Sequence, residues 1–257
     1  MTEDIVISEV KGKVAWIYLN RLDKYNAINR DMVEKLIEYL KKYEQQKGVV
    51  AIAITSKGKV FSAGLDLAEL SSIKNVEDSH KIFYERLYTL VREMVNLSKP
   101  IIIVVNGLAI GGAFEILYGA DIVIATRDAK FSIAEARWGF IPPVSVVLGS
   151  LLMGLQNASR LVLTTDTISA EEAKSLGIVS NVVNQDEVEK IVKEYAEKLS
   201  GSSPEAIMEI KKIMSRIKLN PMVEWAFEVL VRLAGKEKHV ENIKRFVSGK
   251  KMPEWDW

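Results

Sequence analysis

Two glutamates and two glycine-containing turns are the parts of this sequence that could do chemistry together. Glu115 stands in the first turn of an otherwise apolar predicted helix, Glu135 follows twenty residues later, and the turns contain Gly64 and Gly112. Glycine lets the backbone approach a ligand closely, and free N–H groups there can hold a carbonyl oxygen that gains negative charge. Two carboxyls beside such an oxyanion hole are what proton transfer next to an enolate requires.

Each of these residues also has a simpler interpretation. Glycines after strands often form only tight turns, and a glutamate in a first helical turn can merely stabilise the helix N-terminus. Glu135 could be an exposed loop acid paired with Arg137. Because Glu115 lies in an apolar stretch, however, we expect it to be partly buried with a raised pKa. The residues alone leave both interpretations open.

Composition excludes several other kinds of site. The chain has no cysteine, which excludes disulfides, thiolate metal sites and cysteine nucleophiles. Its 35 basic and 34 acidic residues are mixed along the chain, which argues against nucleic-acid binding. Neither glycine turn has the G-x-G-x-x-G or G-K-[ST] pattern of nucleotide sites, so a nicotinamide-dependent oxidoreductase is not favoured. With no signal peptide and no apolar stretch of membrane-spanning length, we expect a cytoplasmic protein.

The elements that must position the glutamates follow an α/β pattern. Strands are predicted at Val14–Leu19, 49–55, Ile101–Val105 and Ile122–Thr126, with helices over 31–43, 82–97 and 113–119 between and after them. Short apolar strands that alternate with helices predict parallel sheets. Amphipathic helices then follow over 187–199, 204–217 and Pro221–Ala234. We expect an α/β core with the active site over residues 1–185 and a helical region over 186–257, in which Lys211 and Lys212 belong to a solvated face.

Four stretches resemble motifs of the enoyl-CoA hydratase/isomerase (crotonase) superfamily. Residues 19–29, L-N-R-L-D-K-Y-N-A-I-N, resemble its N-R-P-x-x-x-N-A-[LI] stretch, and residues 61–67, F-S-A-G-L-D-L, resemble its F-x-A-G-x-D-[IL] turn. Residues 106–115, N-G-L-A-I-G-G-A-F-E, are similar to N-G-x-A-x-G-G-G-x-E. Residues 168–173 and 176–179, I-S-A-E-E-A and L-G-I-V, are similar to [IL]-[ST]-A-x-E-A and G-[LIV]-V. The motifs occur in order along essentially the whole chain.

The resemblance implies a fold, a ligand and a set of binding residues. The fold is a crotonase-like spiral core of repeated ββα units with a C-terminal helical region used for assembly, as a homotrimer or a hexamer made of two trimers. The ligand is an acyl-CoA thioester, bound without metal or redox cofactor, whose oxygen the N–H groups of Leu65 and Gly112 would hold. The expected substrate-binding residues, including those of the CoA channel, the adenine site and the pocket wall, are Lys24, Ala27, Ile28, Ala63, Gly64, Asp66, Leu67, Gly111, Pro142 and Pro143. Trp225, Phe227, Trp255 and Trp257 could lie in a subunit interface or pack within the chain.

The two acids point to one reaction within the superfamily. Family hydratases carry a glutamate at both places occupied here by Glu115 and Glu135. The resemblance therefore implies a 2-enoyl-CoA hydratase, in which Glu135 donates a proton to the α-carbon and Glu115 helps to activate water. The alternatives are a double-bond isomerase that uses the same enolate, and a catalytically weak acyl-CoA-binding protein on the same fold.

One departure from the family pattern lies just after Glu135. Typical hydratases have G-x-x-P-G-x-G-G there, whereas residues 139–146 read G-F-I-P-P-V-S-V. Pro143 and Val144 should stiffen and fill this wall of the acyl pocket, and pocket volume governs which acyl groups fit. We therefore expect selection among acyl groups, with branched ones as candidates, and the acyl chain itself stays open.

Overall fold

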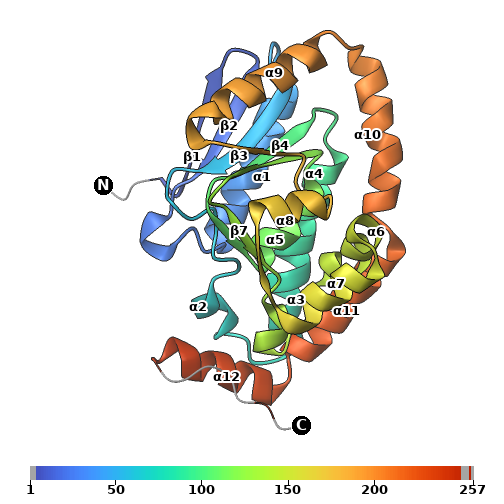
Figure 1. The fold of residues 1–257 in the computed structure, drawn as a ribbon. Helices are drawn as coiled ribbons and strands as arrows, with labels where there is room; N and C mark the ends of the chain where they lie inside the picture. Colours follow the sequence, from blue (N-terminus) through green and yellow to red (C-terminus); the bar gives the residue numbers. More distant parts are fainter. Residues whose placement is uncertain (1–3, 250–254, 256–257) are drawn as a thin grey trace.

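A six-stranded sheet forms the centre of the protein, whose computed structural model describes residues 4–249 and Trp255. The strand order is β1-β2-β3-β4-β6-β9, with β1 antiparallel to β2 and all later neighbours parallel. The strands are β1 Val6–Lys11, β2 Val14–Leu19, β3 Ala51–Ser56, β4 Ile101–Val105, β6 Ile122–Thr126 and β9 Asn181–Val183 (Figure 1). The predicted parallel α/β arrangement is confirmed.

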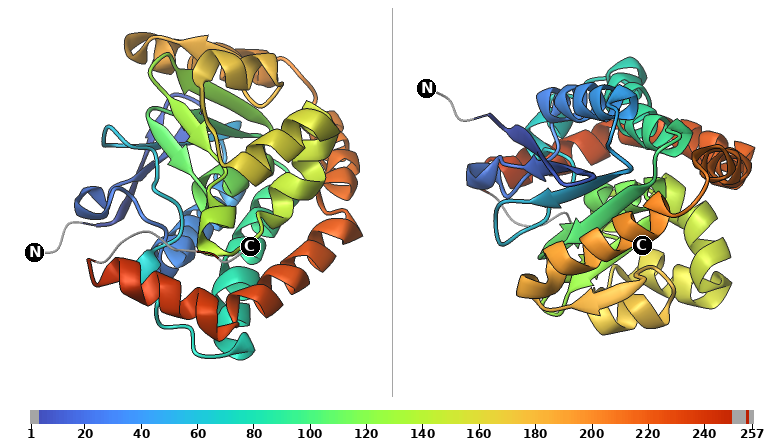
Figure 2. Two further views of the ribbon diagram at one scale, coloured as in Figure 1. Left: turned by 60° about the horizontal axis from the view of Figure 1, so that its bottom comes forward. Right: turned by 90° about the horizontal axis from the view of Figure 1, so that it is seen from above.

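Helices cover both faces of this sheet, because its central strands carry apolar side chains on both faces. On one face, the core includes buried residues of α1 (Arg30–Gln45) and α4 (Thr89–Asn96). On the other face, Trp16 of β2 packs in a second cluster with Val192 of α9 (Val188–Ser200). Figure 2 shows α1 and α9 on opposite sides of the strands.

A smaller sheet lies beside the first and carries the chain to the two glutamates. It has the order β5-β7-β8, with β5 Leu108–Ile110, β7 Lys130–Ser132 and β8 Thr167–Ser169. β5 runs parallel to β7, and β7 runs antiparallel to β8. Glu115 follows β5 and Glu135 follows β7, so neighbouring strands deliver both acids to one end of this sheet.

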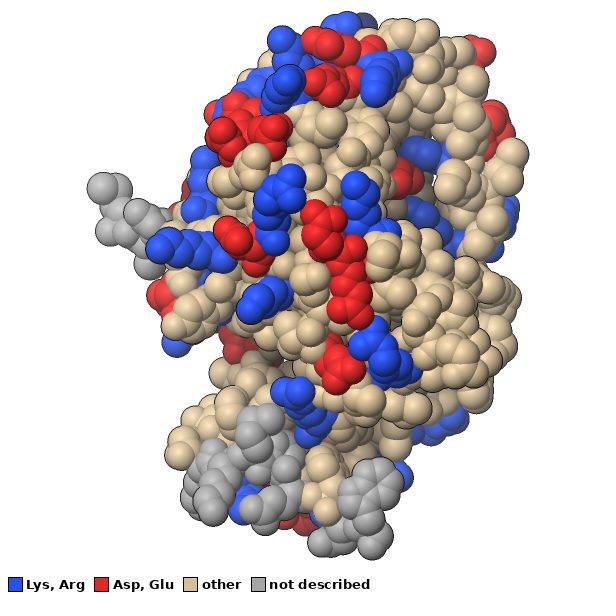
Figure 3. Space-filling model, viewed as in Figure 1, with Lys and Arg blue, Asp and Glu red and all other residues tan. Residues whose placement is uncertain are grey.

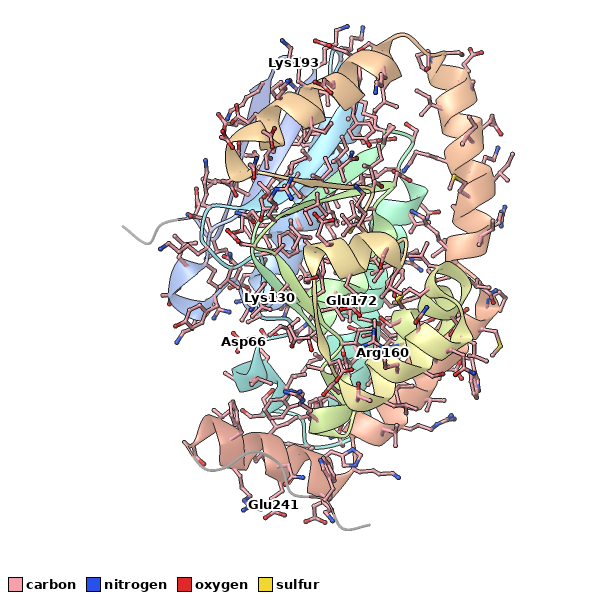
Figure 4. All side chains as sticks on the ribbon, in the orientation of Figure 1. Asp66, Lys130, Arg160, Glu172, Lys193 and Glu241 are labelled. Atoms are coloured by element: carbon pink, nitrogen blue, oxygen red, sulfur yellow. The ribbon has the colours of Figure 1, made fainter. Side chains whose placement is uncertain are left out.

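Short helices fill the connections. They are η1 Leu22–Lys24, α2 Leu67–Leu70, α3 Val76–Ile82, η2 Phe83–Tyr88, α5 Gly112–Glu115, η3 Ile116–Gly119, η4 Glu135–Trp138, η5 Ser145–Gly149, α6 Ser150–Met153, α7 Leu155–Thr164, α8 Ala170–Ser175 and η6 Gln185–Glu187; η2 and η5 are π-helical and the other η elements are 3₁₀. The helix predicted over 113–119 thus divides into α5 and η3. Arg160 of α7 and Glu172 of α8 form an ion pair at 2.6 Å, and both are labelled in Figure 4.

The C-terminal helices wrap back over the core. They are α9, α10 (Pro204–Lys218), α11 (Pro221–Ala234) and α12 (Glu237–Val247), and the last three form an arc along one side and the lower end in Figure 1. Contacts join α11 to α3 and η2, and α12 to α2 and η4. The helical region is confirmed, with α12 in addition to the predicted helices, whereas the division at residue 185 stays a prediction.

Ion pairs anchor α10 to the core. Lys211 is only 5% exposed, and its ammonium pairs with Asp121 Oδ2, which also accepts the Ile101 N–H at 2.8 Å. Lys218 lies 3.6 Å from Asp121 Oδ1 and donates to the Ala120 carbonyl. The expectation of a solvated Lys211 was therefore wrong, because the partly buried aspartate before β6 pairs with it.

Candidate active site

In the turn around Gly64, the backbone N–H of Leu65 points away from the segment that contains Ile28. Ile28 donates to the Gly64 carbonyl at 2.7 Å and accepts from the Asp66 N–H at 3.0 Å. Because successive N–H groups of an extended chain point to opposite sides, the N–H of Leu65 between them points away from Ile28. Gly64 has a φ of +85°, which places it in the left-handed region that favours glycine.

A second N–H lies beside the first at the start of α5. A Cβ atom built on Gly112 would lie 3.4 Å from the Leu65 nitrogen, and one built on Gly64 would lie 3.3 Å from the Gly112 nitrogen. Gly112 is the first residue of α5, so its N–H has no acceptor within that helix. The structure therefore brings together the two donors predicted for an oxyanion hole, and their role in holding the thioester oxygen stays a prediction.

Glu115 is completely buried, and both of its carboxyl oxygens accept hydrogen bonds. Oε2 accepts from the Val144 N–H at 2.7 Å, and Oε1 accepts from the Ser145 N–H at 3.1 Å and from the Ser145 hydroxyl. Burial raises the pKa of Glu115 to about 7, while the three hydrogen bonds act in the opposite direction. The expectation of a raised pKa is met, and the carboxyl is more deeply buried than expected.

Glu135 has a different environment at the start of η4. A Cβ atom built on Gly111 would lie 3.2 Å from Glu135 Oε1, so this carboxyl lies against the turn that leads to Gly112. Its Oε2 is covered and has no hydrogen-bond partner among the described residues. Burial, followed by the charge of Glu115, raises the pKa of Glu135 well above its ordinary value. Arg137 binds Thr165 Oγ1 at 2.5 Å.

Tyr118 is the other titratable group at this pair. Burial raises its pKa above the ordinary range, and the charges of Glu115 and Glu135 add to that rise. A Cβ atom built on Gly149 would lie 2.7 Å from the Tyr118 hydroxyl, which has no hydrogen-bond partner among the described residues. Because Tyr118 remains a neutral phenol around neutral pH, it adds no charge to the site there.

A cavity of about 230 Å³ extends from the two N–H groups past Glu135. Glu135 and Arg137 are the charged residues in its wall. Its apolar and glycine lining consists of Ala63, Gly64, Leu65, Leu67, Leu70, Phe83, Leu87, Ile110, Gly111, Gly112, Ala134, Trp138, Phe140, Ile141, Pro143 and Leu230. Such a cavity fits an apolar acyl group whose polar end meets the donors.

Some of the predicted site residues line the cavity, and others lie outside its lining. Those that line the cavity are Ala63, Gly64, Leu65, Leu67, Gly111, Gly112, Glu135 and Pro143; Lys24, Ala27, Ile28, Asp66, Pro142 and Glu115 lie outside its lining. Lys24 is exposed and Ile28 is buried behind the Gly64 turn. Asp66 caps α2 by accepting the Ala68 N–H at 2.9 Å and pairs with Arg21 at 2.5 Å; Figure 4 labels it near the start of that helix. Direct substrate contacts of these residues stay predictions.

Sequence reasoning missed several parts of the site. Ser145 was noted only as a departure from a glycine pattern, and Trp138, Phe83 and Leu230 were not considered as cavity lining. Phe83 packs edge-on against Phe140 with their ring centroids 5.3 Å apart. The signal for Ser145 was a serine directly after Pro-Pro-Val, where a helix can begin, but its glutamate partner is thirty residues away. Spacing alone does not reveal such a contact.

Comparison with known proteins decides the family. Residues 9–256 match the family described as enoyl-CoA hydratase/isomerase. The chain belongs to this family. A short-chain-enoyl-CoA hydratase of Clostridium acetobutylicum is 33% identical over 82% of this chain and 81% of that protein. A 1,2-epoxyphenylacetyl-CoA isomerase of Escherichia coli is 31% identical over 85% of each chain.

Solved structures of this family share the fold. An enoyl-CoA hydratase/isomerase from Xanthobacter autotrophicus Py2 has a TM-score of 0.87 with 25% identity, over 96% of this chain and 94% of that one. A methylmalonyl-CoA decarboxylase in complex with 2-nitronate-propionyl-CoA has a TM-score of 0.83 with 25% identity, over 98% of each chain. The crotonase-like fold expected for this chain is confirmed.

The outer surface has a mixed character. Figure 3 shows basic and acidic side chains interspersed over one face.

Within residues 4–249 and Trp255, no cluster of three or more histidine, aspartate or glutamate side chains could hold a metal ion. No helix in the described ranges has the length and apolarity needed to cross a bilayer.

Proposed function

We propose that this family member is a 2-enoyl-CoA hydratase, a hydro-lyase that adds water across the 2,3-double bond to give 3-hydroxyacyl-CoA. The observation that carries the proposal is a pair of carboxyls with unlike surroundings beside two converging N–H groups: Glu115 is fully buried, whereas Glu135 is partly buried and lines the cavity. Several relatives, including the Clostridium protein, are named enoyl-CoA hydratases. Paired titratable groups whose environments separate their protonation states are suited to acid and base roles.

Each group would have one task in the reaction. The N–H groups of Leu65 and Gly112 hold the thioester oxygen, which carries the negative charge when the water oxygen bonds to the β-carbon. Glu115, as a carboxylate, takes one proton from that water, and Glu135, as a carboxylic acid, gives its proton to the α-carbon. A proton then passes from Glu115 to Glu135, directly or through solvent, and restores both groups. The chemistry needs only the thioester and water.

The cavity supports a compact acyl group. Pro143 and the aromatic rings of Phe83, Phe140 and Trp138 bound the space beyond the donors, and a rigid wall discriminates by shape. The CoA part would leave past Ala63 toward Lys24, where the chain is exposed. A homotrimer or hexamer and a cytoplasmic location also stay proposals.

One observation favours a double-bond isomerase as the second candidate. Both oxygens of Glu115 are engaged by Val144 and Ser145, and Glu115 does not line the cavity. If no water can reach it, Glu135 alone would move a proton between carbons of the same enolate. The similarity to the Escherichia coli isomerase fits this candidate.

Product analysis tests the proposal. Purified protein incubated with straight, branched and aromatic 2-enoyl-CoA esters should consume the conjugated thioester, and the product mass should rise by one water. Glu115→Gln and Glu135→Gln should each lower the turnover number by about 100-fold or more. Conversion of 3-enoyl-CoA to the 2-enoyl isomer without water gain, or full hydration rates in both folded variants, would contradict it.

A further inference from the structure

The segment directly after Pro143 donates hydrogen bonds to Glu115, whereas Oε2 of Glu135 has no partner among the described residues. Val144 and Ser145, where the helical run begins, give two backbone N–H groups and one hydroxyl to Glu115. Both donor residues are fully buried. A carboxylate that accepts several hydrogen bonds in a buried place is stabilised as the anion, because these bonds favour the charged form.

The same turn has no donor for Glu135. Proline has no N–H, so Pro142 and Pro143 cannot donate from the wall that Pro143 shares with Glu135. The first two N–H groups after the prolines go to Glu115, and Glu135 Oε2 has no partner among the described residues. The sequence P-P-V-S thus distributes its donors unequally between the two acids.

We propose that Ser145 is a positioning residue whose hydroxyl keeps Glu115 ionised and oriented as the base, so that the shared proton of the pair resides on Glu135. This inference rests on the proposed hydration and assigns each acid its starting state. The family pattern has glycine where Ser145 stands, and glycine can offer only its N–H. Here the hydroxyl adds a third donor to the same carboxyl, on the Oε1 that also accepts the Ser145 N–H.

Few titratable groups face Glu115, which makes its protonation measurable. They are Glu135 from η4 and Tyr118 from η3, and Tyr118 stays neutral around neutral pH because burial raises its pKa. The Ser145 hydroxyl is the largest influence that lowers the pKa of Glu115 against the effect of burial. Removing it should make the base harder to ionise without changing the cavity lining.

The pH profile of Ser145→Ala tests this role. Hydration requires ionised Glu115, so the turnover number of the wild type should rise through about pH 7. In Ser145→Ala this rise should move up by about one pH unit, with KM unchanged and recovery toward wild-type turnover at higher pH. The matched control is Ser150→Ala in the same helical run, whose hydroxyl donates to the Val146 carbonyl at 2.7 Å. It should leave the profile in place.

Several results would contradict the positioning role of Ser145. A loss by the same factor at every pH, an unshifted profile, or a rise in KM alone would overturn the positioning role. Should Ser145→Ala fail to fold, infrared titration of the wild type gives the decision, with the carboxyl bands assigned by Glu115→Gln and Glu135→Gln. The Glu115 band should ionise at lower pH than the Glu135 band, and the reverse order would overturn the inference. A wild type that does not hydrate would refute the proposed function, while this titration would still show which of the two glutamates holds the proton.

Discussion

At the scale of single residues, the two glutamates differ in what surrounds their oxygens. Glu115 has three donors, whereas Glu135 has a covered oxygen without a partner in the described part of the chain. Burial and the charge of Glu115 disfavour the ionised form of Glu135 more than its backbone hydrogen bonds favour it, so protonation stabilises this carboxyl. A group suited to donate a proton is therefore also one that destabilises the fold when it loses that proton.

We expect the destabilisation caused by ionising Glu135 to appear in the pH dependence of the free energy of unfolding. The pKa of Glu135 is higher in the folded protein than in the unfolded chain, so unfolding releases a proton and the free energy of unfolding falls as pH rises above the ordinary carboxyl range. Glu135→Gln should lose less stability than the wild type as the pH rises above the ordinary carboxyl range. Urea unfolding across this range measures the difference. Exposed Glu209→Gln is the control, and parallel curves for Glu135→Gln and wild type would refute the expectation.

The sequence identified these acids, and the family resemblance implied their roles, but the contacts that distinguish their surroundings were not visible in it. The motifs around Gly64, Gly112 and Glu115 lie within short stretches, so their types and order were visible. The contacts from Val144 and Ser145 join residues 29 and 30 positions from Glu115. The suggested Glu135–Arg137 pair failed for a related reason, since Arg137 finds Thr165 across the fold. Such long-range contacts depend on how η4, η5 and α7 pack, which local patterns do not specify.

At the scale of elements, the Gly64 turn and the start of α5 are fitted to each other. A Cβ atom on Gly64 would lie 2.6 Å from the Ile110 carbonyl oxygen, which is too close for any side chain. Widening this contact would separate the N–H groups of Leu65 and Gly112. The distance between the two donors therefore depends on the absence of one side chain.

Gly64→Ala should consequently impair catalysis. Displacing one oxyanion donor should lower the turnover number by about 100- to 1,000-fold. Gly48→Ala is the matched control, because Gly48 has a φ of +82° and its added Cβ would meet no atom within 4 Å. The control should cost about 1–2 kcal/mol of stability and leave turnover intact. Steady-state kinetics and thermal unfolding check both variants, and equal turnover in both would show that the contact does not position the donors.

Element boundaries were predictable where local chemistry marks them. The prediction for α11 matched both ends, Pro221 and Ala234, because proline favours the first turn and Gly235 follows the last. The helices within 145–164 were not predicted, since the run V-V-L-G-S-L-L-M-G is apolar with glycines and shows no helical periodicity. Several apolar side chains of these helices are exposed, including Leu151 at 65% and Leu155 at 67%, so the sequence lacks the polar stripe by which a surface helix is recognised.

At the scale of the whole molecule, one side of the protein is unusually apolar. Large side chains there are exposed, including Leu163 of α7 at 76% and Ile213 of α10 at 67%. Figure 1 shows these helices on the same side, with α11 beside them. Trp225 of α11 is 55% exposed, whereas Phe227 is buried within the chain and Trp257 lies outside the described residues. Exposed apolar surfaces of this kind are typical of subunit interfaces.

We therefore expect self-association, with a trimer as the basic unit. Sedimentation equilibrium at micromolar concentration should give three times the mass of the chain, or six times for a hexamer. Leu163→Glu should shift the protein toward monomers because it places a charge in an apolar contact. Val10→Glu, on the exposed part of β1, is the control and should not. A monomeric wild type would exclude the trimer.

The attachment of α10 has a consequence for heating. Asp121 with Lys211 and Lys218 joins this helix to the core through charges that are largely withdrawn from water. The free energy of hydrating ions becomes less favourable as temperature rises, so the cost of keeping them out of water falls. Apolar burial gains no comparable advantage at high temperature. On warming, the ion pairs that attach α10 to the core should thus weaken less than the apolar contacts around them.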